Sequence, residues 1–192
     1  MTTRQYSSVI AHSTDAEFRA WGLEFKTELL AAGLVQTADT GQIDWATVVR
    51  PVTAVNAGYE MYRFSDALQA TAPVFIKIEY GSSSATAGRP AITITVGTAT
   101  NGAGTLSGTV STARQVCSSA TSVTTGTAFL TQICHADGYL GVSFKQGVYS
   151  YGAPCFWVGR TCDSAGAPTG VGVHVATLNG GTAAGTFLSQ SL

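Results

Sequence analysis

Two neighbouring stretches of alternating apolar residues constrain the fold of this chain more than any other feature. Large apolar side chains occupy every second position, first at Val74, Ile76, Ile78 and Tyr80 and then at Ile92, Ile94 and Val96. Because alternate side chains of a strand share one face, each stretch predicts a half-buried strand, and the pair predicts an antiparallel hairpin. The connection, Gly81–Pro90, is longer than the loops of about two to five residues that most hairpins use.

An amphipathic helix is predicted upstream, over TDAEFRAWGLEFKTELLAAGL at residues 14–34. Thr14 and Glu17 have the spacing of a capping box, and Gly33 stands where a left-handed residue ends a helix. The apolar residues between them recur at offsets of three and four, at Phe18, Trp21, Phe25 and Leu29.

Further strands are predicted on both sides of this hairpin. They lie at Tyr59–Phe64, in GYLGVSFKQGVYS from residue 138, in APCFWVGRT from residue 153 and in GVGVHVATL from residue 170. The third is apolar on both faces and is expected to be central, and CDSAGAPTG joins it to the fourth as a hairpin. The fold class predicted is α+β: one N-terminal amphipathic helix packed on mainly antiparallel β-sheet. We expect a single structural domain over residues 1–192, with extended arms at 1–13 and 178–192 and Gly/Ser-rich loops.

The chain is unusually poor in charge. Charged residues make up 11% of it, against about 25% in average globular proteins. Sixteen of them lie between Arg4 and Arg89, and five follow. A net charge of −1 without a basic cluster argues against direct nucleic-acid binding. A surface with so few charges is poorly protected against association.

Targeting and membrane signals are not expected. The N-terminal residues MTTRQYSSVIAHSTDAEF carry no apolar core of a secretory leader, which favours synthesis in the cytosol. No apolar run approaches the roughly 20 residues that span a bilayer, so we expect no membrane insertion.

Candidate catalytic motifs are weak. GAGTLSG at residues 102–108 lacks the Lys and Ser/Thr of a phosphate-binding loop, and no Gly-x-Ser-x-Gly elbow occurs. The carboxylates fit structural roles better than acid/base chemistry: capping for Asp15 and Glu17, turns for Asp39, Asp44 and Asp66. We therefore expect no enzyme, no catalytic residues and no cofactor.

Cysteine and histidine do not have the spacing of a metal site. The residues are Cys117, Cys134, His135, Cys155, Cys162, His12 and His174. The one close pair, Cys134 and His135, is adjacent, so the two side chains point to opposite faces of a strand. Cys155 and Cys162 also face opposite ways on one strand, and buried free thiols are expected.

Aromatic residues offer a possible sugar-stacking platform. The residues considered are Trp21, Trp45, Trp157, Tyr149 and Tyr151. Trp21 and Trp157 are interpreted as core residues, which leaves GVYSYGAP, with Tyr149 and Tyr151, as the candidate for an exposed aromatic edge.

Four segments together carry a resemblance to known proteins. They are AEFRAWGLEFKTELLAAGLVQTADTGQIDWATVVRP, AGYEMYRFSDALQATAPVFIKIEYGSSS, RPAITITVGTATNGAGTLSG and RTCDSAGAPTGVGV. The chain resembles a group of tailed-bacteriophage virion structural proteins over these segments. The resemblance implies a subunit of the tail, baseplate or head–tail neck, made in the host bacterial cytoplasm and partnered by copies of itself and other virion proteins.

The loops Gly81–Pro90 and Ala99–Gly108 and both arms are then expected to order against neighbouring subunits. Two alternatives stay open. One is a capsid decoration or fibre-type carbohydrate-binding adhesin, with a weak glycan contact near Tyr149 and Tyr151. The other is a particle-borne hydrolase, for which no residue stands out.

Overall fold

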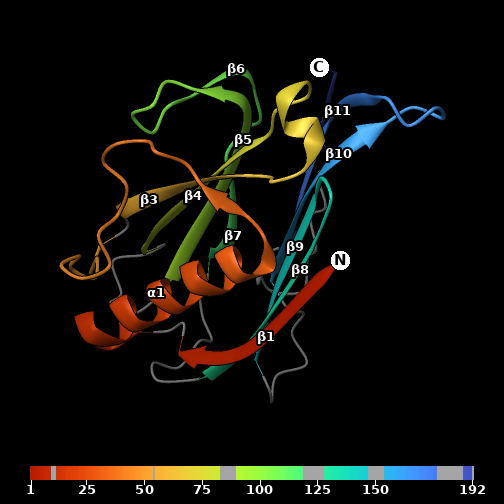
Figure 1. The fold of residues 1–192 in the computed structure, drawn as a ribbon. Helices are drawn as coiled ribbons and strands as arrows, with labels where there is room; N and C mark the ends of the chain where they lie inside the picture. The colour runs from red at the N-terminus through yellow and green to blue at the C-terminus, as the bar shows by residue number, and fades with distance from the viewer. Residues whose placement is uncertain are drawn as a thin grey trace.

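The chain forms two antiparallel sheets and one α-helix (Figure 1). The computed structural model describes residues 1–9, 12–53, 55–82, 90–118, 128–146, 154–176 and 188–191. The prediction of helix with mainly antiparallel sheet is confirmed, but the fold is mainly β and has two sheets instead of one.

Sheet A is assembled from the N-terminal strand and the C-terminal half of the chain. Its strands, in spatial order, are β1 (Thr2–Val9), β8 (Ala128–Ala136), β9 (Tyr139–Gln146), β10 (Cys155–Cys162), β11 (Pro168–Ala176) and β12 (Leu188–Ser191). β10 lies between β9 and β11, as its apolar sequence predicts.

Sheet B contains the antiparallel hairpin predicted for residues 74–96. Its order is β2 (Val35–Gln36), β3 (Asn56–Arg63), β4 (Phe75–Ser82), β5 (Pro90–Thr100) and β6 (Leu106–Val110), and β7 (Arg114–Ser118) also pairs with β5. In the predicted hairpin, Ile78 pairs with Ile94 in an antiparallel register. The short 3-10 helix η1 (Ala67–Ala70) joins β3 to β4.

The helix α1 (Asp15–Ala32) begins and ends where its caps predict. The Thr14 side chain accepts a hydrogen bond from the Glu17 N–H, 3.2 Å away. Gly33 adopts φ 112°, a left-handed conformation that costs glycine little, and its N–H closes the last turn onto Leu29 and Leu30. Phe18, Trp21, Phe25 and Leu29 are all buried, as their spacing predicts.

One hydrophobic core fills the space between the two sheets and the helix. It joins the inward residues of sheet B, such as Ile76 and Ile94, to those of sheet A, such as Val142 and Val158. α1 closes one side of this core, where the Phe25 ring lies 5.7 Å from that of Phe144 and 6.4 Å from that of Tyr80.

The predicted N-terminal arm is part of the sheet. Residues 2–9 form β1, which pairs with β8 along its whole length, and Figure 1 shows it beside α1 at the edge of sheet A. Of the predicted C-terminal arm, residues 188–191 pair with β11 as β12, and the others lie outside the described residues.

One predicted loop is a tight turn. Residues Ala99–Gly108 were expected to order against a neighbour, but β5 continues to Thr100 and β6 begins at Leu106. The Asp39 carboxylate ties this turn down by accepting hydrogen bonds from the Thr100 hydroxyl and from the Gly104 N–H, 3.1 Å away. The loop was mispredicted because Asp39 is distant in sequence. The other predicted assembly loop, residues 81–90, lies mostly outside the described residues.

Candidate functional site

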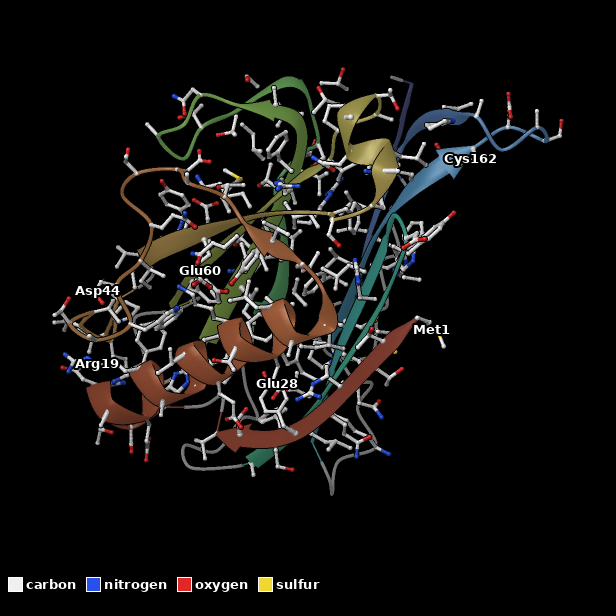
Figure 2. All side chains as sticks on the ribbon, viewed as in Figure 1. Met1, Arg19, Glu28, Asp44, Glu60 and Cys162 are labelled. Atoms are coloured by element: carbon white, nitrogen blue, oxygen red, sulfur yellow. The ribbon has the colours of Figure 1, made fainter. Side chains whose placement is uncertain are left out.

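A carboxylate is enclosed in the core, where the sequence indicated only an alternating strand. Glu60 on β3 is fully buried, and Figure 2 shows it between α1 and the strands of sheet B. Its carboxylate accepts hydrogen bonds from Trp45 Nε1 at 3.1 Å, from the Tyr62 hydroxyl at 2.8 Å and from the Tyr80 hydroxyl at 2.7 Å. Lys26 Nζ from α1 lies 3.6 Å away.

These contacts make Glu60 a structural group. Burial first, and the nearby Glu60 charge second, raise the pKa of Tyr62 and Tyr80 well above 10, so both hydroxyls keep the protons that they donate. The Glu60 carboxylate is fully buried and bonds to side chains of β3, β4, α1 and the segment around Trp45. It therefore links these elements and is not accessible to a substrate. Sequence reasoning missed it, although Glu60 shares a face with Tyr62 and Phe64, which could have signalled burial.

A buried arginine links the two sheets. Arg160 is on the inward face of β10 and 2% exposed. Its Nε donates to the Ala72 carbonyl at 2.8 Å, its Nη2 to Gln69 Oε1 at 3.0 Å, and its Nη1 to the Asp66 carboxylate. The guanidinium also lies over the Phe64 ring, 5.1 Å from its centroid. Asp66 was predicted as a turn residue, so its role as the partner of Arg160 was missed.

The cysteines and histidines are dispersed. Cys134 is exposed while its neighbour His135 is buried, which confirms that they face opposite ways. Cys155 is half-buried and Cys162 is exposed. Cys134, Cys155 and Cys162 are all free thiols, as predicted, but none of them is buried, so the prediction of buried thiols is wrong. Figure 2 shows Cys162 at the far end of its strand. Within the described residues, no three His, Cys, Asp or Glu side chains form a group that could hold a metal ion.

The aromatic candidates separate into two groups. Trp21 and Trp45 lie in the core, but Trp157 is half-buried on the outer face of sheet A, so the interpretation of Trp157 as a core residue is wrong. Strand parity explains this, because Trp157 alternates with the inward residues Phe156 and Val158. Tyr149 and Tyr151 lie outside the described residues.

The solvent side of α1 carries an uncharged stripe. Its residues are spaced by three and four positions and are all exposed, and we call them the α1 outer face: Ala16, Ala20, Leu23, Thr27 and Leu30. Leu23 is 54% exposed and Leu30 39%. The helix is therefore apolar on the side that faces the core and nearly apolar on the side that faces solvent.

Two charged side chains on the flanks of α1, those of Arg19 and Glu28, bond within the chain. Arg19 Nε donates to the Val48 carbonyl at 2.6 Å, and Glu28 pairs with Arg4 at 2.5 Å. Arg19 thereby holds the segment that carries Val49, which is 66% exposed, against the first half of the helix. Figure 2 shows Arg19 near this segment and Glu28 near the N-terminal strand.

A neighbour that covers the α1 outer face would therefore bury little charge. Cores of protein–protein interfaces are depleted of charged residues for the same reason, because desolvating an unpaired charge is costly. The arrangement makes this helix face the candidate functional site of the described chain.

No helix among the described residues has the length and apolar character needed to cross a bilayer. Comparison with protein-family models, with curated proteins and with solved structures finds no match for this chain.

Proposed function

We propose that this chain is a non-enzymatic structural subunit of a tailed-phage virion, located in the tail, baseplate or head–tail neck. Its partners are copies of itself and other virion proteins. The resemblance of its sequence segments to virion structural proteins suggests the particle, and the α1 outer face supports an assembly role.

The observation that carries the proposal is the exposed, uncharged outer side of α1. Leu23, Leu30 and Val49 are each more than a third exposed, although a helix on the surface of a monomer normally turns charged side chains to water. Contiguous exposed apolar surface marks interaction sites. A subunit enclosed by neighbours in a particle would keep this face covered.

The first experiment locates the protein. Purified particles of the phage that carries the chain are labelled with gold-tagged antibody against the protein and viewed by negative-stain microscopy. Gold confined to the tail, its tip or the neck supports the proposal. Gold spread over the capsid indicates a decoration protein instead, and particles without label, intact or disrupted, contradict a virion role.

The second experiment tests the surface. Leu23→Glu places a charge in the centre of the α1 outer face, and Thr112→Glu places the same charge on an exposed residue between β6 and β7. In phage lacking its own copy, the Thr112 variant should restore infectious particles and the Leu23 variant should not, although both fold. Equal rescue by the two variants would exclude the helix face as the assembly surface.

A further inference from the structure

The outer face of sheet A carries an aromatic pair. Tyr139 on β9 and Trp157 on β10 alternate with inward residues, and their ring centroids lie 5.8 Å apart with the planes tilted by 33°. Tyr139 is 41% exposed, and Trp157 is half-buried. α1 packs on the opposite, inward face of this sheet, so the aromatic pair is remote from the α1 outer face.

The two aromatic rings pack against two glycines, Gly159 and Gly172. A Cβ atom on Gly159 would lie 2.4 Å from Tyr139 Cδ1 and 2.5 Å from Trp157 Cζ2, and one on Gly172 would lie 2.9 Å from Trp157 Cζ3. The rings therefore rest directly on strand backbone, in space that any other residue would fill. Glycine in a strand weakens the strand and often marks a place where another group approaches closely.

A row of neutral polar side chains runs beside the aromatic pair. Ser143 pairs across β9 and β10 with Cys155, two residues from Trp157 on the same face. The Ser143 hydroxyl lies 3.4 Å from Gln132 Oε1, and Gln132 Nε2 donates to Gln5 Oε1 at 3.1 Å. This row extends from β9 across β8 to β1 and supplies amide and hydroxyl groups that both donate and accept hydrogen bonds.

The face is also nearly free of formal charge. Among the described outward-facing residues of β1 and β8–β11, Lys145 is the only Lys, Arg, Asp or Glu, and it lies two residues beyond Ser143 on β9. A phosphate polymer would need several cations on this face. The chemistry instead matches a neutral ligand that has one apolar side and a rim of hydroxyl groups.

We propose that Tyr139 and Trp157 form a binding platform for a neutral pyranose saccharide. A pyranose ring presents a flat side of C–H groups, whose partial positive charge is attracted to the negative face of an aromatic ring. Its hydroxyl groups project from the edge of that ring, toward the amide and hydroxyl groups of Gln132 and Ser143. The inference does not depend on the proposed virion role.

Tryptophan fluorescence tests the proposal on the unmodified chain. Trp21 is 2% exposed and Trp45 5%, so iodide in solution quenches mainly the half-buried Trp157. The probes are the neutral oligosaccharides maltohexaose, cellohexaose and hexa-N-acetylchitohexaose, each added at millimolar concentration. At least one of them should protect the fluorescence from iodide in a saturable way. Lack of protection by all three would overturn the proposal.

Variants then assign the protection to the platform. Tyr139→Ala should weaken saccharide binding about tenfold, the effect of losing one stacked ring, whereas Tyr139→Phe should bind normally. Trp157→Ala should abolish binding in a calorimetric titration that needs no fluorophore. Leu23→Ala, on the α1 outer face, is the matched control and should bind like the wild type.

Two results would contradict the assignment. Undiminished binding by both alanine variants would place any saccharide elsewhere on the chain. A loss of self-association in Trp157→Ala, measured by sedimentation without any saccharide effect in the wild type, would make this face a contact between proteins.

Discussion

At the scale of single residues, the buried carboxylate of Glu60 shows how one polar group can organise a core. It accepts hydrogen bonds from three buried donors, those of Trp45, Tyr62 and Tyr80. A buried donor without an acceptor would lower the free energy of unfolding. The cluster stabilises the fold only while it is complete. Removal of the Glu60 carboxylate would leave the donors of Trp45, Tyr62 and Tyr80 buried without an acceptor.

We expect Glu60→Leu to lower the free energy of unfolding by about 3–5 kcal/mol, the range found when one partner of a buried charged group is lost. Urea unfolding followed by circular dichroism measures it. Glu79→Gln, at a partly exposed position of the neighbouring strand β4, is the control and should change stability by less than about 1 kcal/mol. A small effect at Glu60 would show that the cluster rearranges easily.

His12 should make stability depend on pH. Burial lowers its pKa from the ordinary 6.5 to about 3, with Glu17 opposing this shift and Arg50 adding to it. As the pH falls, His12 is therefore protonated near pH 6.5 in the unfolded chain but only near pH 3 in the folded chain.

The contribution of His12 to the free energy of unfolding is complete above pH 6.5 and falls by up to about 1.4 kcal/mol for each pH unit below it. In His12→Phe, which suits the neighbouring rings of Phe18 and Trp21, this decline should be shallower. Urea titrations at several pH values between 7 and 4 measure the difference. Parallel curves for variant and wild type would refute it.

At the scale of elements, Arg160 is the contact that joins β10 to the η1 connection of the other sheet. Arg160→Met should lower the free energy of unfolding by about 3–5 kcal/mol, because it leaves the Asp66 carboxylate buried without its cation. Adding Asp66→Asn should restore part of the loss, and the double-mutant cycle measures the coupling.

Arg4 provides the matched control for Arg160. It also pairs with a carboxylate, that of Glu28, but its side chain is 43% exposed. Arg4→Met should leave the urea midpoint almost unchanged. Equal losses of stability in Arg4→Met and Arg160→Met would show that the effect of removing an ion pair does not depend on its burial.

Elements whose positions depend on residues near in sequence could be predicted, and elements that depend on distant residues could not. The α1 boundaries were predicted because Thr14, Glu17 and Gly33 act on backbone groups within one turn. β8 was missed because Thr131 and His135, both buried, occupy two of its inward positions and obscure the apolar alternation. The sequence did not show that the turn after β5 is held within the chain, because Asp39, which bonds it, lies some sixty positions away in sequence.

At the scale of the whole molecule, the α1 outer face predicts self-association. The purified chain should form oligomers in sedimentation velocity, and Leu23→Glu with Leu30→Glu should convert them to monomers that keep the circular dichroism spectrum of the wild type, since both side chains are exposed. The same double change made with Gln in place of Glu would separate loss of apolar surface from charge repulsion. A wild-type chain that is monomeric at all concentrations would contradict self-association.

The sequence by itself determined the elements whose causes are short-range: the capped helix, the β4–β5 hairpin and the inward apolar positions of β9 and β11. Only the tertiary structure decided that the strands divide into two sheets, that Glu60 and Arg160 are buried and paired, and that Trp157 faces outward over glycines. The physical reason is that capping and strand alternation depend on neighbours within a few residues. Burial of a polar or aromatic side chain depends on which distant segment packs against it, as Asp66 does against Arg160.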